Sequence, residues 1–157
     1  MNKAFTLIEV SVIIAVMAIL LSISTFNLLS FQDRTSVDTT VETLISDIKH
    51  QQLKSMTGAT EGNPNPSTYG IYFQQNNYTL FTGATYTSTD PLNFSINVSE
   101  TIQITTAFPQ NRIIFGKGNG EIQGFTSGNN TITILHTPSN IQKVITLNKY
   151  GTIISIN

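Results

Sequence analysis

The chain opens with MNKAFTLIEVSVIIAVMAILLSI, residues 1–23, an apolar run that carries a single acid, Glu9. From Val10 to Gln32 no other charged residue follows. About 20 consecutive apolar residues suffice to cross a bilayer as a helix. A charged side chain at depth in a bilayer costs roughly 2.5–3.5 kcal/mol on insertion scales. Either the run is not a membrane segment, or Glu9 is a functional group that needs a partner.

Three interpretations of residues 5–31 compete. A buried core helix is disfavoured because the run is apolar on every face and too long for a domain of this size. A secretory signal peptide would fit the short leader with Lys3, and Ser22–Ser24 resembles a small-residue cleavage site. Its apolar part, however, is normally 7–15 residues long and uncharged. We therefore favour a membrane anchor, oriented by Lys3 with its N-terminus in the cytoplasm.

Residues 32–57 continue this helix with a different pattern. Apolar residues recur at spacings of three and four, and acids and a lysine occupy other positions, as in an amphipathic helix. Lys54 in the last turn and Gly58 just beyond it are typical of a helix end. A continuous helix from Phe5 to about Thr57 would be roughly 80 Å long. The apolar stripe is Val37, Val41, Leu44, Ile45 and Ile48.

The period of the sequence changes after the loop Gly58–Thr68, which is rich in Gly, Asn and Pro. Short segments of alternating apolar and polar residues predict an antiparallel sheet with one buried and one wet face. The stripe of residues 32–57 is the natural cover for the buried face. The fold class is therefore α+β, a long N-terminal helix packed on a C-terminal β domain, residues 58–157. The expected strands are Tyr69–Gln74, Tyr78–Thr82, 92–98, 101–106, two runs within 111–125, 130–136, 141–147 and 152–156.

The composition limits the possible functions. Of 157 residues only 11% are charged, the net charge is −1, and lysines and arginines are scattered singly. Nothing global therefore favours nucleic acid or an anionic surface as a partner. The chain has no cysteine, which excludes disulfides, thiolate metal sites and cysteine nucleophiles.

The segment Ala4-Phe5-Thr6-Leu7-Ile8-Glu9, after a short leader with Lys3 and before a helical apolar run, resembles the N-terminus of type IV prepilins and pseudopilins. The resemblance implies that a prepilin peptidase removes residues 1–4 by cutting between Ala4 and Phe5, and that Phe5 becomes the N-methylated residue. The residue before the cut is usually Gly in that family, and here it is Ala4. Phe26 lies in a region where many major pilins have a Pro.

The same resemblance gives Glu9 a role in assembly, because its counterpart pairs with the N-terminal ammonium of a neighbouring subunit. A carboxylate in an apolar environment becomes acceptable when a cation neutralises it. Cleavage before Phe5 would create that ammonium. Within one chain Glu9 also lies about one turn from the start of the helix, where it could compensate its own helix end.

The rest of the chain resembles, at the level of the fold, the minor pseudopilins called H-like or FimT-like. The resemblance implies a structural subunit of a type II secretion pseudopilus or a type IV pilus, not an enzyme. It implies a single-pass protein of the cytoplasmic membrane with an extracytoplasmic β domain, which then enters the filament. The implied partners are other pilin subunits, the prepilin peptidase and the inner-membrane assembly platform. The alternative is a signal-anchored extracytoplasmic binding module that forms no filament.

The two histidines have simpler explanations than catalysis. Asp47 and His50 share one helix face, which we interpret as solvated. His136 could be paired with Asp90 or Glu121 in a hydrolase, but no nucleophile motif accompanies it. We expect no catalytic residue, no metal and no cofactor.

Two further patterns resemble binding motifs only superficially. Gly116–Gly124 contains several glycines and Lys117, but it lacks the spacing of a phosphate-binding loop, and we interpret it as a hairpin turn. Nucleic-acid binding needs clustered cations. The candidates Arg112, Lys117, Lys143 and Lys149 are dispersed, and we expect no nucleic-acid partner.

Overall fold

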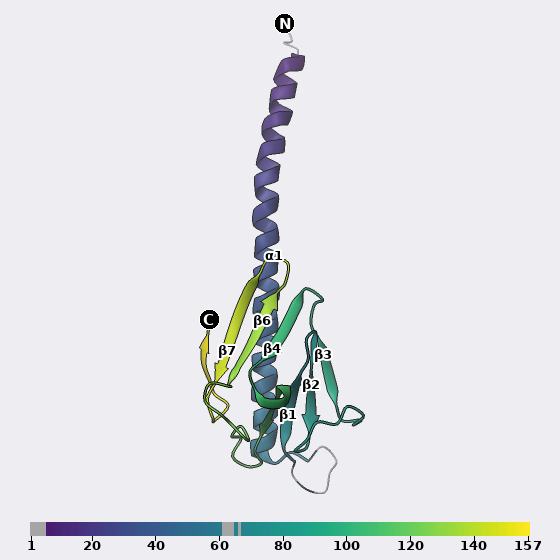
Figure 1. The fold of residues 1–157 in the computed structure, drawn as a ribbon. Coiled ribbons are helices and arrows are strands. Elements are labelled where there is room, and N and C mark those ends of the chain that lie inside the picture. The colour runs from purple at the N-terminus through teal and green to yellow at the C-terminus, as the bar shows by residue number, and fades with distance from the viewer. Residues whose placement is uncertain (1–5, 61–64, 66) are drawn as a thin grey trace.

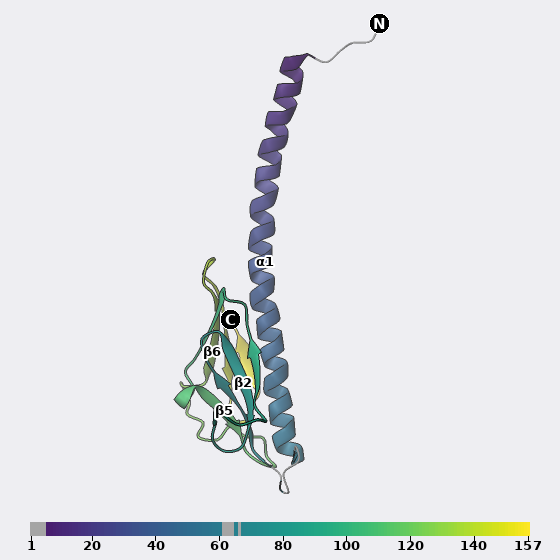
Figure 2. The ribbon, with the colours of Figure 1, turned by 90° about the vertical axis from the view of Figure 1, so that its right-hand side faces the viewer.

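The computed structural model describes residues 6–60, 65 and 67–157, and the side chains of these residues except 23–30. One helix, α1 (Leu7–Thr57), runs the length of the molecule, and a β domain packs against its C-terminal half (Figures 1 and 2). The N-terminal half of α1 projects beyond the domain (Figure 1). The predicted α+β architecture is thus confirmed.

The ends of α1 follow from local sequence. Thr6, with extended φ/ψ of −77° and 150°, is the N-cap, so the helix begins at Leu7. The predicted start at Phe5 lies outside the described residues. At the other end Gly58 has φ 69°, and its N–H donates to the carbonyl oxygen of Lys54. That left-handed cap is most easily adopted by glycine, and it confirms the predicted end of the helix.

Within the part of the chain that the structure describes, no helical segment is both long and apolar enough to cross a membrane. The predicted membrane segment 5–31 includes Phe5 and the side chains of residues 23–30, which lie outside that description. It stays a prediction.

The predicted amphipathic half of α1 is confirmed. Val37, Val41, Leu44 and Ile48 are almost completely buried in the core, and Ile45 packs against it. Burying a Val, Leu or Ile side chain contributes about 1.5–3 kcal/mol, so this stripe holds the helix on the domain. Ser55 extends the contact, because its hydroxyl donates to the carbonyl oxygen of Phe115 at 2.7 Å.

The strands form two sheets, whereas the sequence predicted one. The first sheet has the order β3-β2-β1-β5 and the second the order β4-β6-β7-β8, and every pair is antiparallel. The chain changes sheet between β3 and β4, and it returns to the first sheet with β5. The bounds are β1 (Tyr69–Phe73), β2 (Asn77–Thr82), β3 (Phe94–Asn97), β4 (Ile102–Thr106), β5 (Arg112–Phe115), β6 (Thr131–His136), β7 (Ile141–Leu147) and β8 (Ile153–Ile156).

The Gly-rich segment after β5 forms a turn but no second strand. Gly116 N–H donates to the carbonyl oxygen of Glu121 at 2.8 Å, and a single bridge joins Phe115 to Ile122. The amide of Gln123 donates to the carbonyl oxygen of Ile114 at 2.8 Å and completes this bridge. The amide of Ile122 donates to the carbonyl oxygen of Lys149. The predicted turn is therefore confirmed, and the predicted strand after it is wrong.

The sequence predicted that each strand has one buried and one solvent-exposed face. Strand β6 follows this prediction, since buried and partly exposed residues alternate along it. The prediction is wrong for the first sheet. Phe81, Thr79 and Ile114 point away from α1, yet they are buried. Tyr86, from the loop after β2, covers Phe81: the centroid of its ring lies 4.1 Å from that of Tyr72 in a stacked arrangement and 5.6 Å from that of Phe81 in an edge-on arrangement. A loop without regular periodicity supplies this cover, which strand patterning does not reveal.

Gly70 makes this second layer possible. A Cβ at Gly70 would lie 2.5 Å from Cζ of Phe81 and 2.6 Å from the carbonyl oxygen of Ile113. Since both neighbours are buried, neither has free space to move into.

We predict that Gly70→Ala destabilises the fold by about 1–3 kcal/mol through overpacking. The measurement is thermal unfolding of the full-length protein in detergent micelles, followed by circular dichroism. Thr105→Ala, at an exposed position of β4, is the control, with an expected change below about 1 kcal/mol. Equal melting temperatures for the Gly70→Ala protein and the unaltered protein would show that the loop over Phe81 yields easily.

Candidate functional site: the projecting helix and its first turn

The projecting part of α1 exposes apolar side chains all round its circumference. Leu7 is 89% exposed and Leu21 67% exposed, and the large apolar residues between them are exposed as well. Soluble monomers rarely expose continuous apolar patches larger than a few hundred Å². This segment therefore requires a cover outside the chain itself. The exposed members are Leu7, Ile8, Val10, Val12, Ile13, Ile14, Val16, Met17, Ile19, Leu20 and Leu21.

Glu9 lies at the start of this segment and is bound to Thr6. The backbone N–H and the hydroxyl of Thr6 donate to Oε2 of Glu9 at 2.8 and 2.7 Å. The N–H of Glu9 in turn contacts Oγ1 of Thr6 at 3.3 Å. This is a capping box, in which two free donors of the first helical turn are satisfied reciprocally. The negative charge also lies at the positive end of the helix dipole.

The capping box refines the role predicted for Glu9. In the isolated chain the carboxylate compensates its own helix end, which was one of the two expected roles. It shares a shallow surface hollow with the apolar side chains of Ile8, Val12 and Ile13. A cation that approaches here meets a carboxylate surrounded by apolar surface, where electrostatic attraction is stronger than in water.

Thr6 was missed as a functional residue, although the sequence contains the information. Thr6-Leu7-Ile8-Glu9 has the Ser/Thr-x-x-Glu spacing of a capping box directly before an apolar run. The predicted cleavage and methylation residues, Ala4 and Phe5, lie outside the described residues. Their roles stay predictions.

His136 lies between α1 and the second sheet and does not contact its imagined partners. Its Nδ1 lies 2.6 Å from the hydroxyl oxygen of Ser139, and its Nε2 lies 3.7 Å from Oδ1 of Asp33. Ser139 is three residues away in the β6–β7 turn, so that contact is local. His136 therefore joins the hairpin to the helix, and pairing with Asp90 or Glu121 is not what the structure shows.

Asp47 and His50 are not brought together as a pair either. His50 is exposed, as the interpretation of a solvated face predicted. Asp47 instead accepts a hydrogen bond from the hydroxyl of Tyr78 at 2.6 Å. Burial raises the pKa of Tyr78 well above its ordinary value, and the hydrogen bond to Asp47 and its negative charge raise it further.

Two of the four dispersed cations are neutralised by carboxylates. Nζ of Lys143 lies 2.6 Å from Oδ1 of Asp38 on α1, and Nζ of Lys149 lies 3.0 Å from Oε2 of Glu121. The hydrogen bond to Glu121 raises the pKa of Lys149. Among the described residues, no group of three or more histidines, aspartates or glutamates could hold a metal ion.

No family model, no curated protein sequence and no solved structure matches this chain. The fold and the site therefore define a class of protein by physical features alone: a β domain carried on a long helix, whose first half has one acid at its start and exposes apolar side chains over residues 7–21.

We predict that Tyr78→Phe destabilises the protein by about 1.5–3 kcal/mol at pH 7, because a hydrogen bond to a charged group is lost. A tyrosine in the unfolded chain ionises above about pH 10, whereas Tyr78 in the folded chain stays neutral. Its contribution is complete below pH 10 and declines as the pH rises above that value.

The Tyr78→Phe variant should accordingly lose less stability between pH 10 and 11 than the unaltered protein. Urea unfolding of the full-length protein in micelles at both pH values measures this. Tyr150→Phe, at an exposed tyrosine, is the control and should behave as the unaltered protein does. An equal loss of unfolding free energy between the two pH values in the Tyr78→Phe variant and the unaltered protein would show that Tyr78 does not contribute through a neutral hydroxyl bound to Asp47.

Proposed function

We propose that this chain is a minor pilin or pseudopilin, a structural subunit of a type II secretion pseudopilus or a type IV pilus. The observation that carries the proposal is the helix segment after Glu9, which is uncharged in sequence and exposed on all sides where its side chains are described. The proposal also rests on the resemblance of residues 4–9 to a prepilin N-terminus.

An apolar helix that its own chain does not cover is stable in two environments. One is the bilayer, where its side chains contact lipid. The other is a bundle of similar helices, where they contact one another. A subunit that is first held in the cytoplasmic membrane and then built into a filament uses both in turn. In this proposal Lys3 lies on the cytoplasmic side of the membrane, and the β domain lies on the extracytoplasmic side.

Glu9 supplies the register of assembly in this proposal. The peptidase cuts between Ala4 and Phe5, and the new ammonium at Phe5 becomes a cation of the kind that Glu9 requires. A neighbouring subunit that presents this ammonium neutralises the carboxylate and sets the axial offset between the two helices. Thr6 holds the carboxylate at the helix start until that partner arrives.

The first test is the mass of the N-terminus after expression with and without a prepilin peptidase. Processing should remove Met1–Ala4 and add one methyl group to Phe5, and no change should occur without the peptidase. An intact N-terminus in both cultures, or cleavage near Ser24, would favour the signal-anchored binding module instead.

The second test separates the two roles of Glu9. Glu9→Val removes both the capping box and the charge, whereas Thr6→Val weakens the capping box and keeps the charge. We expect Glu9→Val to reduce incorporation into sheared filaments at least tenfold, while Thr6→Val reduces it less than threefold. Membrane levels of both variants, measured by immunoblot, should equal those of the unaltered protein.

Equal losses of incorporation in the two variants would mean that Glu9 acts only as a helix cap. Unchanged incorporation of Glu9→Val would remove its role in assembly altogether.

A further inference from the structure

Strand β3 and the residues beside it present an apolar face that the domain covers only in part. Leu92, Phe94, Ile96 and Val98 alternate with polar residues along this segment. In the register of β2 with β3, Ile96 lies opposite Tyr78 and Phe94 opposite Leu80. Tyr78 and Leu80 belong to the hydrophobic core, so the apolar face of β3 lies on the core side of its sheet.

This core-side face is nevertheless open in part: Ile96 and Val98 pack against the core and are half-buried, whereas the other two apolar residues are exposed. Phe94 is 66% exposed and Leu92 is 44% exposed. The reason is the position of α1, which packs mainly on β1, β6 and β7 and leaves the β3 edge of the first sheet without a cover. A space therefore remains between α1 and β3.

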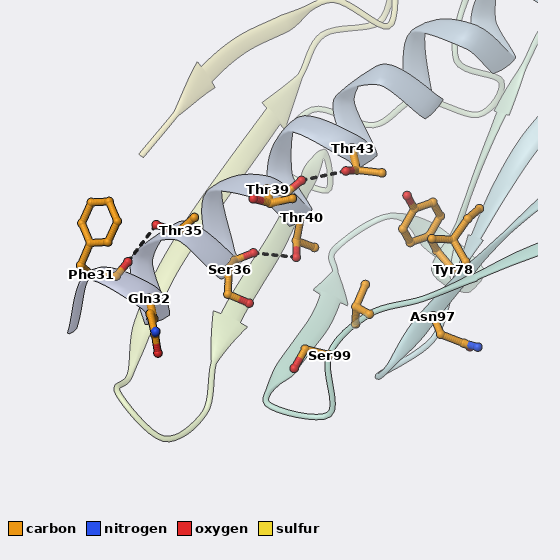
Figure 3. A pocket seen from close by; sticks show the side chains of 12 residues that line it. Phe31, Gln32, Thr35, Ser36, Thr39, Thr40, Thr43, Tyr78, Asn97 and Ser99 are labelled. Atoms are coloured by element: carbon orange, nitrogen blue, oxygen red, sulfur yellow. Dashed lines mark hydrogen bonds between the residues drawn. The ribbon is translucent and has the colours of Figure 1, made fainter. Parts of the chain in front are cut away.

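Two hollows occupy this space. The first, here called the α1–β3 groove, has a volume of about 520 Å³ and lies between residues 31–43 of α1 and residues 96–99 (Figure 3). The second, of about 360 Å³, lies farther along α1 beside Leu92 and Phe94. Tyr78 lines the first hollow and Asp47 the second, and their hydrogen bond joins the two walls.

The α1–β3 groove has walls that suit an uncharged occupant. All the residues that line it are uncharged. On the α1 wall the hydroxyls of Thr35, Thr40 and Thr43 donate to carbonyl oxygens of their own helix at 2.8–2.9 Å (Figure 3). Because these three donors are already used, these threonines offer chiefly their methyl groups to a neighbour. Ile96 and Val98 supply apolar surface on the opposite wall.

The groove is continuous with the projecting helix. Phe31, which is 67% exposed, ends the uncharged segment of α1 and also lines the groove. A second helix that packs along the uncharged segment of α1 toward its C-terminal end therefore reaches the groove. Small side chains such as serine and threonine allow helices to approach closely, and this wall consists largely of them.

We propose that the α1–β3 groove receives the uncharged α1 segment, Val10–Phe31, of a second copy of this chain. The proposal rests on the proposed function, since it presumes that subunits assemble through their helices. It adds that the β domain itself grips a neighbouring helix, and it names the surface. Two needs are met at once, because the exposed helix gains a cover and the partly exposed side chains of Ile96 and Val98 are buried.

Cysteine cross-linking tests this contact directly, because the chain contains no cysteine of its own. Val98→Cys places a thiol in the groove. Ile14→Cys, Ile19→Cys and Leu20→Cys place thiols on three different sides of the exposed helix, because successive helical residues are rotated by about 100°. Each helix variant is co-expressed with the groove variant on a differently tagged full-length chain, so that any mixed-tag product is intermolecular. Membranes and filaments are then oxidised with copper phenanthroline.

The matched control is Ser95→Cys, an exposed position of β3 whose side chain points to the face of the sheet opposite to that of Ile96. We expect a mixed-tag disulfide between Val98→Cys and at least one helix variant, at least tenfold more abundant than with Ser95→Cys. Cross-linking between two chains that both carry Leu20→Cys reports helix assembly separately.

The outcomes separate the two proposals. Helix–helix disulfides without a groove–helix disulfide would overturn the groove contact and leave the proposed function standing. Absence of both products from oxidised filaments and membranes would overturn both. A nitroxide-labelled lipid that quenches a fluorophore on Val98→Cys more than one on Ser95→Cys, without groove–helix disulfides, would assign the groove to a lipid chain instead.

Discussion

The burial of one stripe of α1 is the interaction on which the rest of the structure depends. Val37, Val41, Leu44 and Ile48 fill the space against both sheets, which otherwise touch only lightly. Without the helix each sheet would expose its apolar face to water. The ion pair between Asp38 of α1 and Lys143 of the second sheet lies beside this stripe, and an exposed pair of this kind contributes at most about 1 kcal/mol. Apolar burial therefore determines where the domain is held, and the charges adjust its position.

The same helix is used in two opposite ways along its length. Its C-terminal half is amphipathic and is satisfied within the chain. Its projecting half is apolar in sequence, and the large apolar side chains described there from Leu7 to Leu21 are exposed on every side. Both ends of the helix are capped locally: Thr6 and Glu9 satisfy donors of the first turn, and the Gly58 N–H donates to a carbonyl oxygen of the last turn. The β domain therefore has a buried core of its own, whereas the projecting helix leaves apolar surface in contact with solvent. This exposed apolar surface is the physical basis of the assembly proposed for the protein.

Sequence periodicity predicted the features that depend on local patterns. The helix end at Gly58, the buried stripe and all eight strands follow from spacing and turn residues. The division into two sheets was not predictable in the same way, because β3 and β4 have similar alternation and only their pairing partners separate them. The buried outer layer over Phe81 depends on Tyr86 in an irregular loop. At the site, Glu9 was identified by its cost in an apolar run, and Thr6 could have been identified by the capping-box spacing.

The continuity of α1 has a geometric consequence for the direction in which the β domain faces. Glu9 and Val37 lie on one uninterrupted helix, so the number of residues between them fixes the angle between the acid and the domain about the helix axis. One residue added or removed between them would turn the domain by about 100° and shift it by about 1.5 Å. In a filament whose helices are held by their first turns, the length of this segment therefore selects which face of the β domain points outward.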